Sequence, residues 1–247
     1  MSDYSAFLQR CFLPGAVYAF VGAGGKTTAI LKVAELCAGQ GMRVRITTTT
    51  RFGREEVSRY PLAFASDAGG FLEAVDAAER VCVIASAPDG SASKLLGVDP
   101  LFIDAVRPRS DLLILVEADG ARHRPLKVPT ARDPVIPRIS AAVFGLMGAS
   151  GFGEAIAEEH CYNHEAALRL LGRTGGSFDA PGLAVLAVHP EGLRKGVLPG
   201  MAFHVIINQA DLSEKRTIAH EAVSAIRAAG AGATLLSCQE ERIYESL

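Results

Sequence analysis

The sequence lacks three features that would assign it at once to a class of protein: long apolar runs, paired cysteines and a strong net charge. No apolar run approaches the roughly 18 residues of a membrane span, and residues 1–7 contain no basic stretch followed by an apolar one, so we expect no secretory signal. The five cysteines are far apart and include no CxxC pair, which is typical of reduced thiols in a cytoplasmic protein. A formal net charge of −2 provides no strong field for nucleic acid or an anionic membrane. We therefore expect a cytoplasmic protein that binds neither.

The composition and the order of apolar segments indicate a compact α/β protein. The chain has 247 residues, of which 49% are hydrophobic and 21% charged, and this is too apolar for disorder. Short apolar runs alternate with helix-like segments, which predicts parallel strands joined by helices. We expect helices over 26–38 and 213–229, and strands over 16–21, 43–47, 81–85, 112–116, 141–147, 203–208 and 234–237. We expect a single domain spanning 1–247, with an irregular insertion around 121–182 that is rich in proline and glycine.

A glycine-rich turn follows the first predicted strand and opens the first predicted helix. Three glycines in four residues let backbone N–H groups approach a polyphosphate, and the helix N-terminus adds the positive end of its dipole. Lys26 is expected to reach the β- and γ-phosphates, and the Thr27 hydroxyl to bind Mg²⁺. The turn reads Gly22-Ala23-Gly24-Gly25-Lys26-Thr27-Thr28. It predicts a nucleotide-binding P-loop and a three-layer, P-loop NTPase-like α/β fold, with a mostly parallel sheet and helices on both faces.

This turn is a variant of the usual motif, G-x-x-x-x-G-K-[ST], which would need glycine at the position of Phe20. The shorter form G-x-x-G-K-T-T also occurs in the P-loops of ATP-dependent ligases. One alternative is a structural glycine turn with an accidental Lys-Thr pair. A dinucleotide-binding loop is rejected, because the third glycine of G-x-G-x-x-G would fall on Thr27 and no acidic residue follows within 43–50.

The predicted strand 112–116 leads into Glu117-Ala118-Asp119-Gly120. An acidic residue at the end of an apolar strand is where P-loop proteins hold Mg²⁺, and the pattern resembles the Asp-x-x-Gly of GTPases with Glu117 in the aspartate position. We expect Thr27 and Glu117 to be metal ligands, and Lys26, Glu117 and Asp119 to be catalytic. The pattern does not decide which of the two acids faces the metal, and a charged strand end is the structural alternative.

Four threonines, at positions 47–50, close the second predicted strand. One hydroxyl is expected to contact Mg²⁺ or the γ-phosphate, as a switch residue does, and we assign this catalytic role to Thr49. The alternative is that β-branched residues stand here only because they favour strands.

A late strand ends in Asn208-Gln209-Ala210-Asp211. GTPases bind guanine with Asn-Lys-x-Asp at such a place, so Asn208 and Asp211 are expected to bind the base, with GTP favoured over ATP. Gln209 replaces the usual lysine, and Ser237-Cys238 stands near the position of the Ser-Ala turn of GTPases. The alternative is that Asp211 or Ser213 is a helix N-cap.

With these motifs in order, the chain resembles the YqeC-like family, which is tied by name and context to the maturation of selenium-dependent molybdenum hydroxylases. The resemblance covers nearly the whole chain and implies a nucleotide-binding accessory protein whose partner is a molybdenum hydroxylase or its cofactor. Asp133 stands where we expect the family's usual glutamate. The residues that carry the resemblance are 21–28, 47–50, 117–121, 125–127, 133–137, 164–165, 189–192, 195–196 and 208–211.

Two further clusters have both a functional and a structural interpretation. His160, Cys161 and His164 would form a soft-metal site if the two histidines lie one helical turn apart, and otherwise they are solvated or capping residues. The basic residues Arg122, Arg124 and Lys127 form either an anion-binding segment or a solvated loop.

Three functions fit the sequence, and we favour the first. It is an Mg²⁺-dependent NTP hydrolase that acts as a maturation factor. The second is a transferase or ligase that moves phosphoryl or nucleotidyl groups to a small anion. The third is a non-catalytic chaperone that binds a nucleotide and a cofactor. The sequence leaves the oligomeric state open.

Overall fold

The computed structural model describes residues 3–90 and 93–246, and these residues form one large sheet of nine strands. Eight of these strands are parallel, and only β14, at one edge, runs antiparallel to its neighbour. From edge to edge the order is β14 (Arg242–Glu245), β13 (Gly232–Ser237), β12 (Ala202–Asn208), β10 (Ser140–Gly148), β1 (Val17–Gly22), β8 (Leu112–Glu117), β2 (Arg43–Thr48), β5 (Val81–Ala85) and β4 (Leu62–Phe64).

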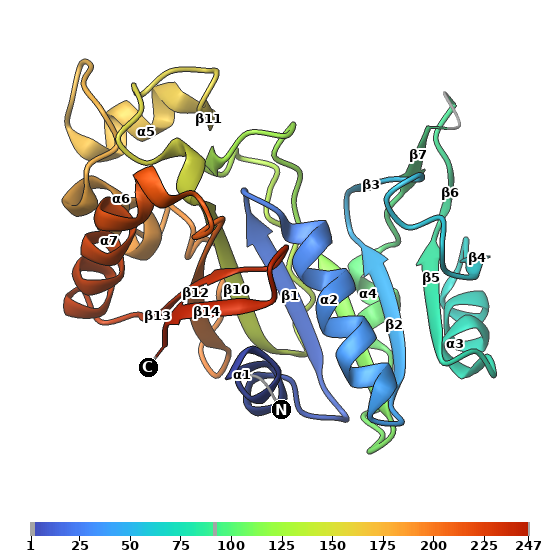
Figure 1. Ribbon diagram of the computed structural model, residues 1–247. Helices are drawn as coiled ribbons and strands as arrows, with labels where there is room; N and C mark the ends of the chain where they lie inside the picture. The colour runs from blue at the N-terminus through green and yellow to red at the C-terminus, as the bar shows by residue number, and fades with distance from the viewer. Residues whose placement is uncertain (1–2, 91–92, 247) are drawn as a thin grey trace.

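Helices cover both faces of the sheet, so the molecule has three layers (Figure 1). The α-helices are α1 (Asp3–Cys11), α2 (Lys26–Gly39), α3 (Ala68–Asp76), α4 (Pro100–Asp104), α5 (His164–Leu171), α6 (Ala180–Val188) and α7 (Arg216–Ala228). Two 3₁₀ turns are η1 (Ala149–Gly151) and η2 (Ser213–Lys215).

The alternation of side chains along β1 explains this layering. Tyr18 and Phe20 pack into the core beneath α1 and α2, whereas Ala19 and Val21 belong to the core beneath α6 and α7. Successive residues of a strand point to opposite faces, so a strand covered on both sides must be apolar throughout. All six residues of β1 are buried, as this requires.

The parallel sheet brings the carboxyl ends of its central strands together along one side, which is the carboxyl-terminal edge of the sheet. In the register of the sheet, Phe20 of β1 lies opposite Glu117 of β8, and Glu117 lies opposite Thr48 of β2. On the other side, Gly22 lies opposite Leu146 of β10. The glycine-rich turn, the acidic strand end and the threonines therefore meet at this edge.

Two small sheets lie beyond the same edge. One pairs β9 (Leu126–Lys127) with β11 (Cys161–Tyr162), and the other is formed by β3 (Arg51–Gly53), β7 (Lys94–Leu96) and β6 (Ala87–Pro88). The segment 121–182 thus contains more regular structure than its sequence suggests: besides β10, which was predicted and is a central strand of the main sheet, it contains β9, β11 and α5.

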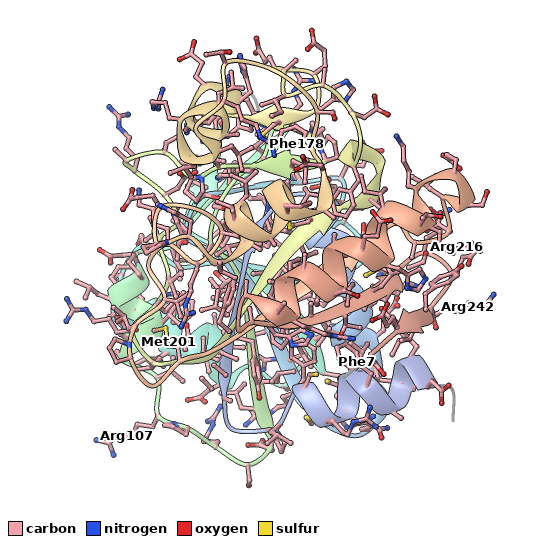
Figure 2. All side chains as sticks on the ribbon, turned by 90° about the vertical axis from the view of Figure 1, so that its left-hand side faces the viewer. Phe7, Arg107, Phe178, Met201, Arg216 and Arg242 are labelled. Atoms are coloured by element: carbon pink, nitrogen blue, oxygen red, sulfur yellow. The ribbon has the colours of Figure 1, made fainter. Side chains whose placement is uncertain are left out.

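The carboxyl-terminal strand β14 contains Tyr244, whose ring contacts two arginines. Arg216 and Arg242 lie over the ring of Tyr244, at 4.8 Å and 4.9 Å from its centroid. Figure 2 shows the two arginines close together on one side of the molecule, whereas Arg107 projects into solvent from the opposite end. Arg216 belongs to α7, so its contact with Tyr244 joins this helix to β14.

Every strand and helix predicted from the sequence is present in the described residues, with ends that differ by up to three residues. The sequence did not predict α1, α3, α4, α5, α6, β4 or β14. Helix α6 is apolar on all sides and therefore has no amphipathic pattern. None of the helices in residues 3–90 and 93–246 combines the length and the hydropathy needed to cross a membrane.

Two arginines of β2 give a test of this architecture. Arg45 is fully buried and donates hydrogen bonds to four carbonyl oxygens, those of Val44, Val75, Ala77 and Glu79. Arg45→Met should lower the free energy of unfolding by about 2–4 kcal/mol, because buried acceptors lose a charged donor. Urea unfolding would measure this.

Arg43→Met is the matched control, because Arg43 pairs at the surface with Asp111. It should cost less than about 1 kcal/mol. Equal losses for the two variants would show that the buried contacts of Arg45 do not stabilise the junction between β2 and α3.

Candidate functional site

The glycine-rich turn, hereafter the glycine loop (residues 22–28), passes so close to neighbouring backbone that side chains are excluded. A Cβ on Gly24 would lie 2.2 Å from the backbone nitrogen of Gly148, and one on Gly22 would lie 2.4 Å from the carbonyl oxygen of Leu146. Both glycines also have positive φ angles, of 85° and 91°. The loop is therefore clamped against the end of β10 in a conformation that favours glycine.

The glycine loop places a helix N-terminus at the edge of the sheet. Gly25 is the N-cap of α2, and within the described residues no side chain caps this end. The first backbone hydrogen bond of the helix runs from Ala29 to Gly25. N–H groups in the first turn of a helix without a cap, together with the helix dipole, suit a bound phosphate.

Lys26 lies in this loop with only 5% of its surface exposed. Its Nζ donates to the carbonyl oxygen of Gly22 at 2.7 Å, and lies 3.2 Å from Oδ1 of Asp119 and 3.9 Å from Oε1 of Glu117. Burial alone would lower the pKa of Lys26, but the charges of Asp119 and Glu117 outweigh it and raise the pKa above its ordinary value. The lysine is thus held as a buried cation at the mouth of the loop.

Glu117 is the acidic residue that the structure brings to Thr27. The Thr27 hydroxyl donates to Oε2 of Glu117 at 2.9 Å. Burial raises the pKa of Glu117 from 4.5 to about 7, although Lys26 and the Thr27 hydrogen bond oppose this. A hydroxyl beside a carboxylate at the start of a helix is an oxygen donor pair that suits Mg²⁺.

Asp119 has a different environment and is fully buried. Its Oδ2 accepts a hydrogen bond from the backbone N–H of Gly22 at 3.0 Å and lies 3.1 Å from Nζ of Lys127. Asp119 therefore fastens the glycine loop, while Glu117 lies next to the threonine hydroxyl. This geometry distinguishes the two acids, which the sequence left equivalent.

The threonines at positions 47–50 bond mainly to the backbone around them. Thr47 donates to the carbonyl oxygen of Ile84, Thr48 to that of Glu117, and Thr49 to that of Val135 at 2.7 Å. The structure thus gives Thr49 a place in joining β2 to the segment that follows β8.

Asn208 connects the glycine loop to the neighbouring strand ends. Its Nδ2 donates to the carbonyl oxygen of Gly24 at 2.8 Å, and its Oδ1 accepts from the backbone N–H of Cys238 at 2.9 Å. Gln209 has a positive φ of 70° and accepts from the Ser150 hydroxyl at 2.8 Å. Asp211 is half-buried just beyond this turn. The structure therefore places the Asn208–Asp211 segment beside the glycine loop.

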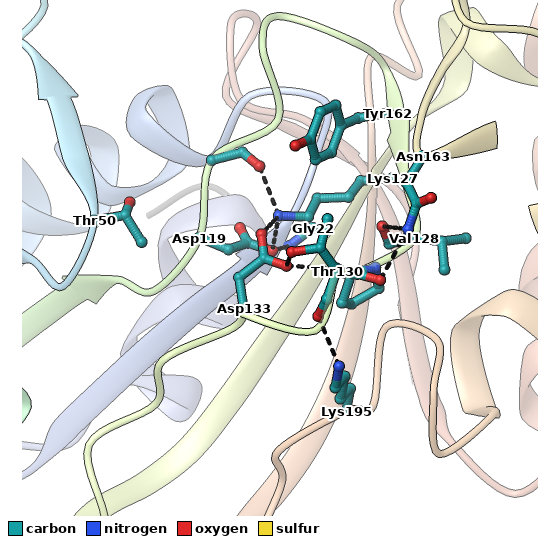
Figure 3. A network of polar contacts seen from close by, with 12 residues as sticks. Gly22, Thr50, Asp119, Lys127, Val128, Thr130, Asp133, Tyr162, Asn163 and Lys195 are labelled. Atoms are coloured by element: carbon teal, nitrogen blue, oxygen red, sulfur yellow. Dashed lines mark hydrogen bonds and ion pairs between the residues drawn. The ribbon is translucent and has the colours of Figure 1, made fainter. Parts of the chain in front are cut away.

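Sequence reasoning named most of the polar side chains that join the acidic strand end to more distant segments, but it did not predict that they contact one another. We call Lys26, Asp119, Lys127, Thr130, Asp133 and Lys195 the polar network. Lys127 pairs with Asp119 and Asp133, the Thr130 hydroxyl donates to Asp133 at 2.8 Å, and Lys195 donates to the carbonyl oxygen of Thr130 at 2.7 Å (Figure 3). Burial would raise the pKa of Asp133, but the hydrogen bonds from Lys127 and Thr130 hold it below its ordinary value.

The structure corrects two interpretations of the sequence. The side chain of Lys127 is fully buried, so this lysine does not belong to a solvated basic loop with Arg122, whose guanidinium lies 5.1 Å from the ring centroid of Tyr162. His160 precedes strand β11 and His164 begins α5, so the two histidines are not one turn apart on a helix. The described residues contain no group of three His, Cys, Asp or Glu side chains suited to a metal ion.

The protein is an α/β protein with a nine-stranded, mostly parallel sheet. A glycine loop, a buried lysine and an acidic strand end lie together at one edge of this sheet. The chain belongs to the YqeC family, whose model, described as "YqeC protein", matches residues 18–165. It is 34% identical over 187 residues to a protein of Escherichia coli strain K12 described as "Uncharacterized protein YqeC". That match covers 74% of this chain and 72% of the relative. The family match contains the glycine loop, both acids and Lys127, and it ends before β12.

Glu117 should make the stability of the protein depend on pH. Its pKa is about 7 when folded and 4.5 in an exposed state, so between these values the folded protein binds more protons than the unfolded chain. The free energy of unfolding should therefore fall by roughly 3 kcal/mol as the pH rises through this window. In Glu117→Gln this decrease should be absent. Urea unfolding of both proteins at about pH 5 and pH 8 measures it.

Glu73→Gln is the control, because Glu73 is an exposed residue of α3. This variant should retain the pH dependence of the wild type. If Glu117→Gln also retains it, Glu117 is not buried as a protonatable group in the folded protein.

Proposed function

We propose that this protein binds an Mg²⁺–nucleoside triphosphate at the glycine loop and hydrolyses it, with GTP preferred over ATP. In this proposal it acts as an accessory factor in the maturation of a molybdenum hydroxylase. The observation that carries the proposal is the convergence of Lys26, Thr27 and Glu117 at an uncapped helix N-terminus.

The residues present fit both a triphosphate and Mg²⁺. The first-turn N–H groups of α2 provide donors for phosphate oxygens, and the ammonium of Lys26 provides a positive charge next to them. Thr27 and Glu117 would hold Mg²⁺, which would supply positive charge that neutralises the phosphates. Hydrolysis belongs to the proposal because the groups that hold the γ-phosphate also stabilise the charge that develops on it during transfer.

The preference for GTP rests on the position of the Asn208–Asp211 segment. Asn208 ties this segment to the carbonyl oxygen of Gly24, so a nucleotide whose phosphates lie on the glycine loop would have its base near Asp211. A carboxylate accepts from both the N1–H and the amino group of guanine, whereas adenine has an acceptor at N1. The partner is proposed from the family resemblance, which links such chains to molybdenum hydroxylases.

Lys26→Met should abolish nucleotide binding. The substitution keeps most of the side-chain volume and removes the ammonium, while Lys127 remains paired with the buried Asp119, so the fold should persist. We expect the affinity for Mg²⁺–GTP and Mg²⁺–ATP to fall roughly 100-fold or more, because charged hydrogen bonds to phosphate are lost. Calorimetric titration measures this, and phosphate release measures hydrolysis.

The control is Lys32→Met, which removes an ammonium from the same helix. Lys32 pairs with Glu241 away from the loop, so this variant should bind like the wild type. Unchanged affinity in Lys26→Met would overturn the assignment of the glycine loop. Tight binding by the wild type without hydrolysis would favour the non-catalytic chaperone.

Asp211→Asn should change the choice of base. Loss of the carboxylate should remove the preference for GTP over ATP, which is expected to be about 1.5–3 kcal/mol, and should favour XTP because asparagine can donate to the xanthine oxygen. Competition among GTP, ATP and XTP measures the change.

Glu214→Gln is the control, since it removes an exposed charge three residues further on. It should leave the preference as it is in the wild type. If the wild type binds ATP and GTP with equal affinity, Asp211 does not select the base and has only a structural role.

A further inference from the structure

Asp119 lies between two lysines, and all three side chains are buried. Oδ1 of Asp119 is 3.2 Å from Nζ of Lys26, and Oδ2 is 3.1 Å from Nζ of Lys127. The side chains of Asp119 and Lys127 are both 0% exposed. Each lysine also has another carboxylate nearby, because Lys26 lies 3.9 Å from Glu117 and Lys127 pairs with Asp133. Asp119 is nevertheless the carboxylate that the two buried cations share.

We propose that Lys127 is a positioning residue that balances the charge of Asp119 when Lys26 turns to the phosphates of a bound nucleotide. This inference rests on the proposed function, in which the ammonium of Lys26 contacts the β- and γ-phosphates. As Lys26 moves to the phosphates, its contact with Oδ1 of Asp119 weakens. A buried carboxylate without a cation is strongly unfavourable, so binding would be opposed unless a second cation stayed in place.

The contacts of Lys127 show that it is fixed where it is. An ammonium has three N–H donors, and Nζ of Lys127 has three oxygen acceptors: Asp119, Asp133 and the carbonyl of Gly120 at 2.6 Å. Figure 3 shows these contacts converging on Nζ, with the ring of Tyr162 nearby. Lys127 therefore has no N–H left for a phosphate, in contrast to Lys26, whose contact with Glu117 is 3.9 Å long.

The rest of the polar network holds this arrangement from the other side. Asp133 is fixed by the hydroxyl of Thr130, and the carbonyl of Thr130 accepts from Lys195. Asp119 also accepts a hydrogen bond from the backbone N–H of Gly22, so the same carboxylate holds the glycine loop. Lys127 thus stays beside Asp119, and Asp119 stays bonded to the loop, whether or not Lys26 is engaged.

The test compares Lys127→Met with the double variant Asp119→Asn/Lys127→Met, using Mg²⁺–GTP and Mg²⁺–ATP as the probes in calorimetric titration. In Lys127→Met, Asp119 has only Lys26 as its cation, so the affinity should fall roughly tenfold or more. In the double variant no buried charge remains at position 119, and asparagine can still accept from Gly22. Its affinity should therefore recover in part, and exceed that of Lys127→Met roughly fivefold or more.

The control is Asp133→Asn/Lys127→Met, which removes the other carboxylate that pairs with Lys127. It should bind as weakly as Lys127→Met, because Asp119 still lacks its second cation. Thermal melting of each variant separates the two effects, since a purely structural role would make affinity follow stability and give no specific rescue by Asp119→Asn. If Lys127→Met does not fold, the two double variants decide: tighter binding by Asp119→Asn/Lys127→Met than by Asp133→Asn/Lys127→Met supports the inference, and equal affinities overturn it.

The outcomes also separate this inference from the proposed function. A wild type that binds neither nucleotide overturns the proposed function and, with it, the role of Lys127. A wild type that binds, together with Lys127→Met of equal affinity, overturns the role of Lys127 alone.

Discussion

The contact between Asp119 and the backbone N–H of Gly22 is the interaction on which the site depends. It joins the end of β8 to the end of β1 inside the protein, where water cannot replace it. A buried carboxylate needs cations and donors around it, and the structure supplies Lys26, Lys127 and this N–H group. One buried carboxylate therefore connects both lysines and the glycine loop.

The main sheet makes this contact possible, because parallel strands bring their carboxyl ends to the same edge. The loop is held from a second side by β10, which approaches Gly24 too closely for any side chain, and from a third by Asn208 at the end of β12. Leu193, from the segment after α6, also packs against Gly22, where an added Cβ would lie 2.5 Å from its methyl group. The loop is thus preorganised by segments throughout the chain, and a preorganised site loses less free energy to ordering when a ligand binds.

The sequence predicted the central strands, the helices α2 and α7 and the layered α/β fold, because parallel strands buried on both faces must be apolar throughout. It did not predict α6, which is apolar on all sides, or the short strands β9 and β11, which have two residues each. In the candidate site, the sequence indicated Lys26, Thr27 and Glu117 through local motifs. It did not indicate Thr130, and it could not show that Lys195 contacts Thr130, because these two residues lie 65 positions apart in the chain.

By itself, the sequence determined where the glycine loop lies and the character of the strands, since both arise from local properties: backbone freedom at glycine and apolar side chains in a row. Only the tertiary structure decided what the charged residues do. It separated Glu117, beside Thr27, from Asp119, beneath the loop, and it buried Lys127 instead of exposing it. The physical reason is that the environment of a charge is set by its neighbours in space. Gly22 and Asp119, which are 97 residues apart in the chain, become neighbours only when the sheet forms.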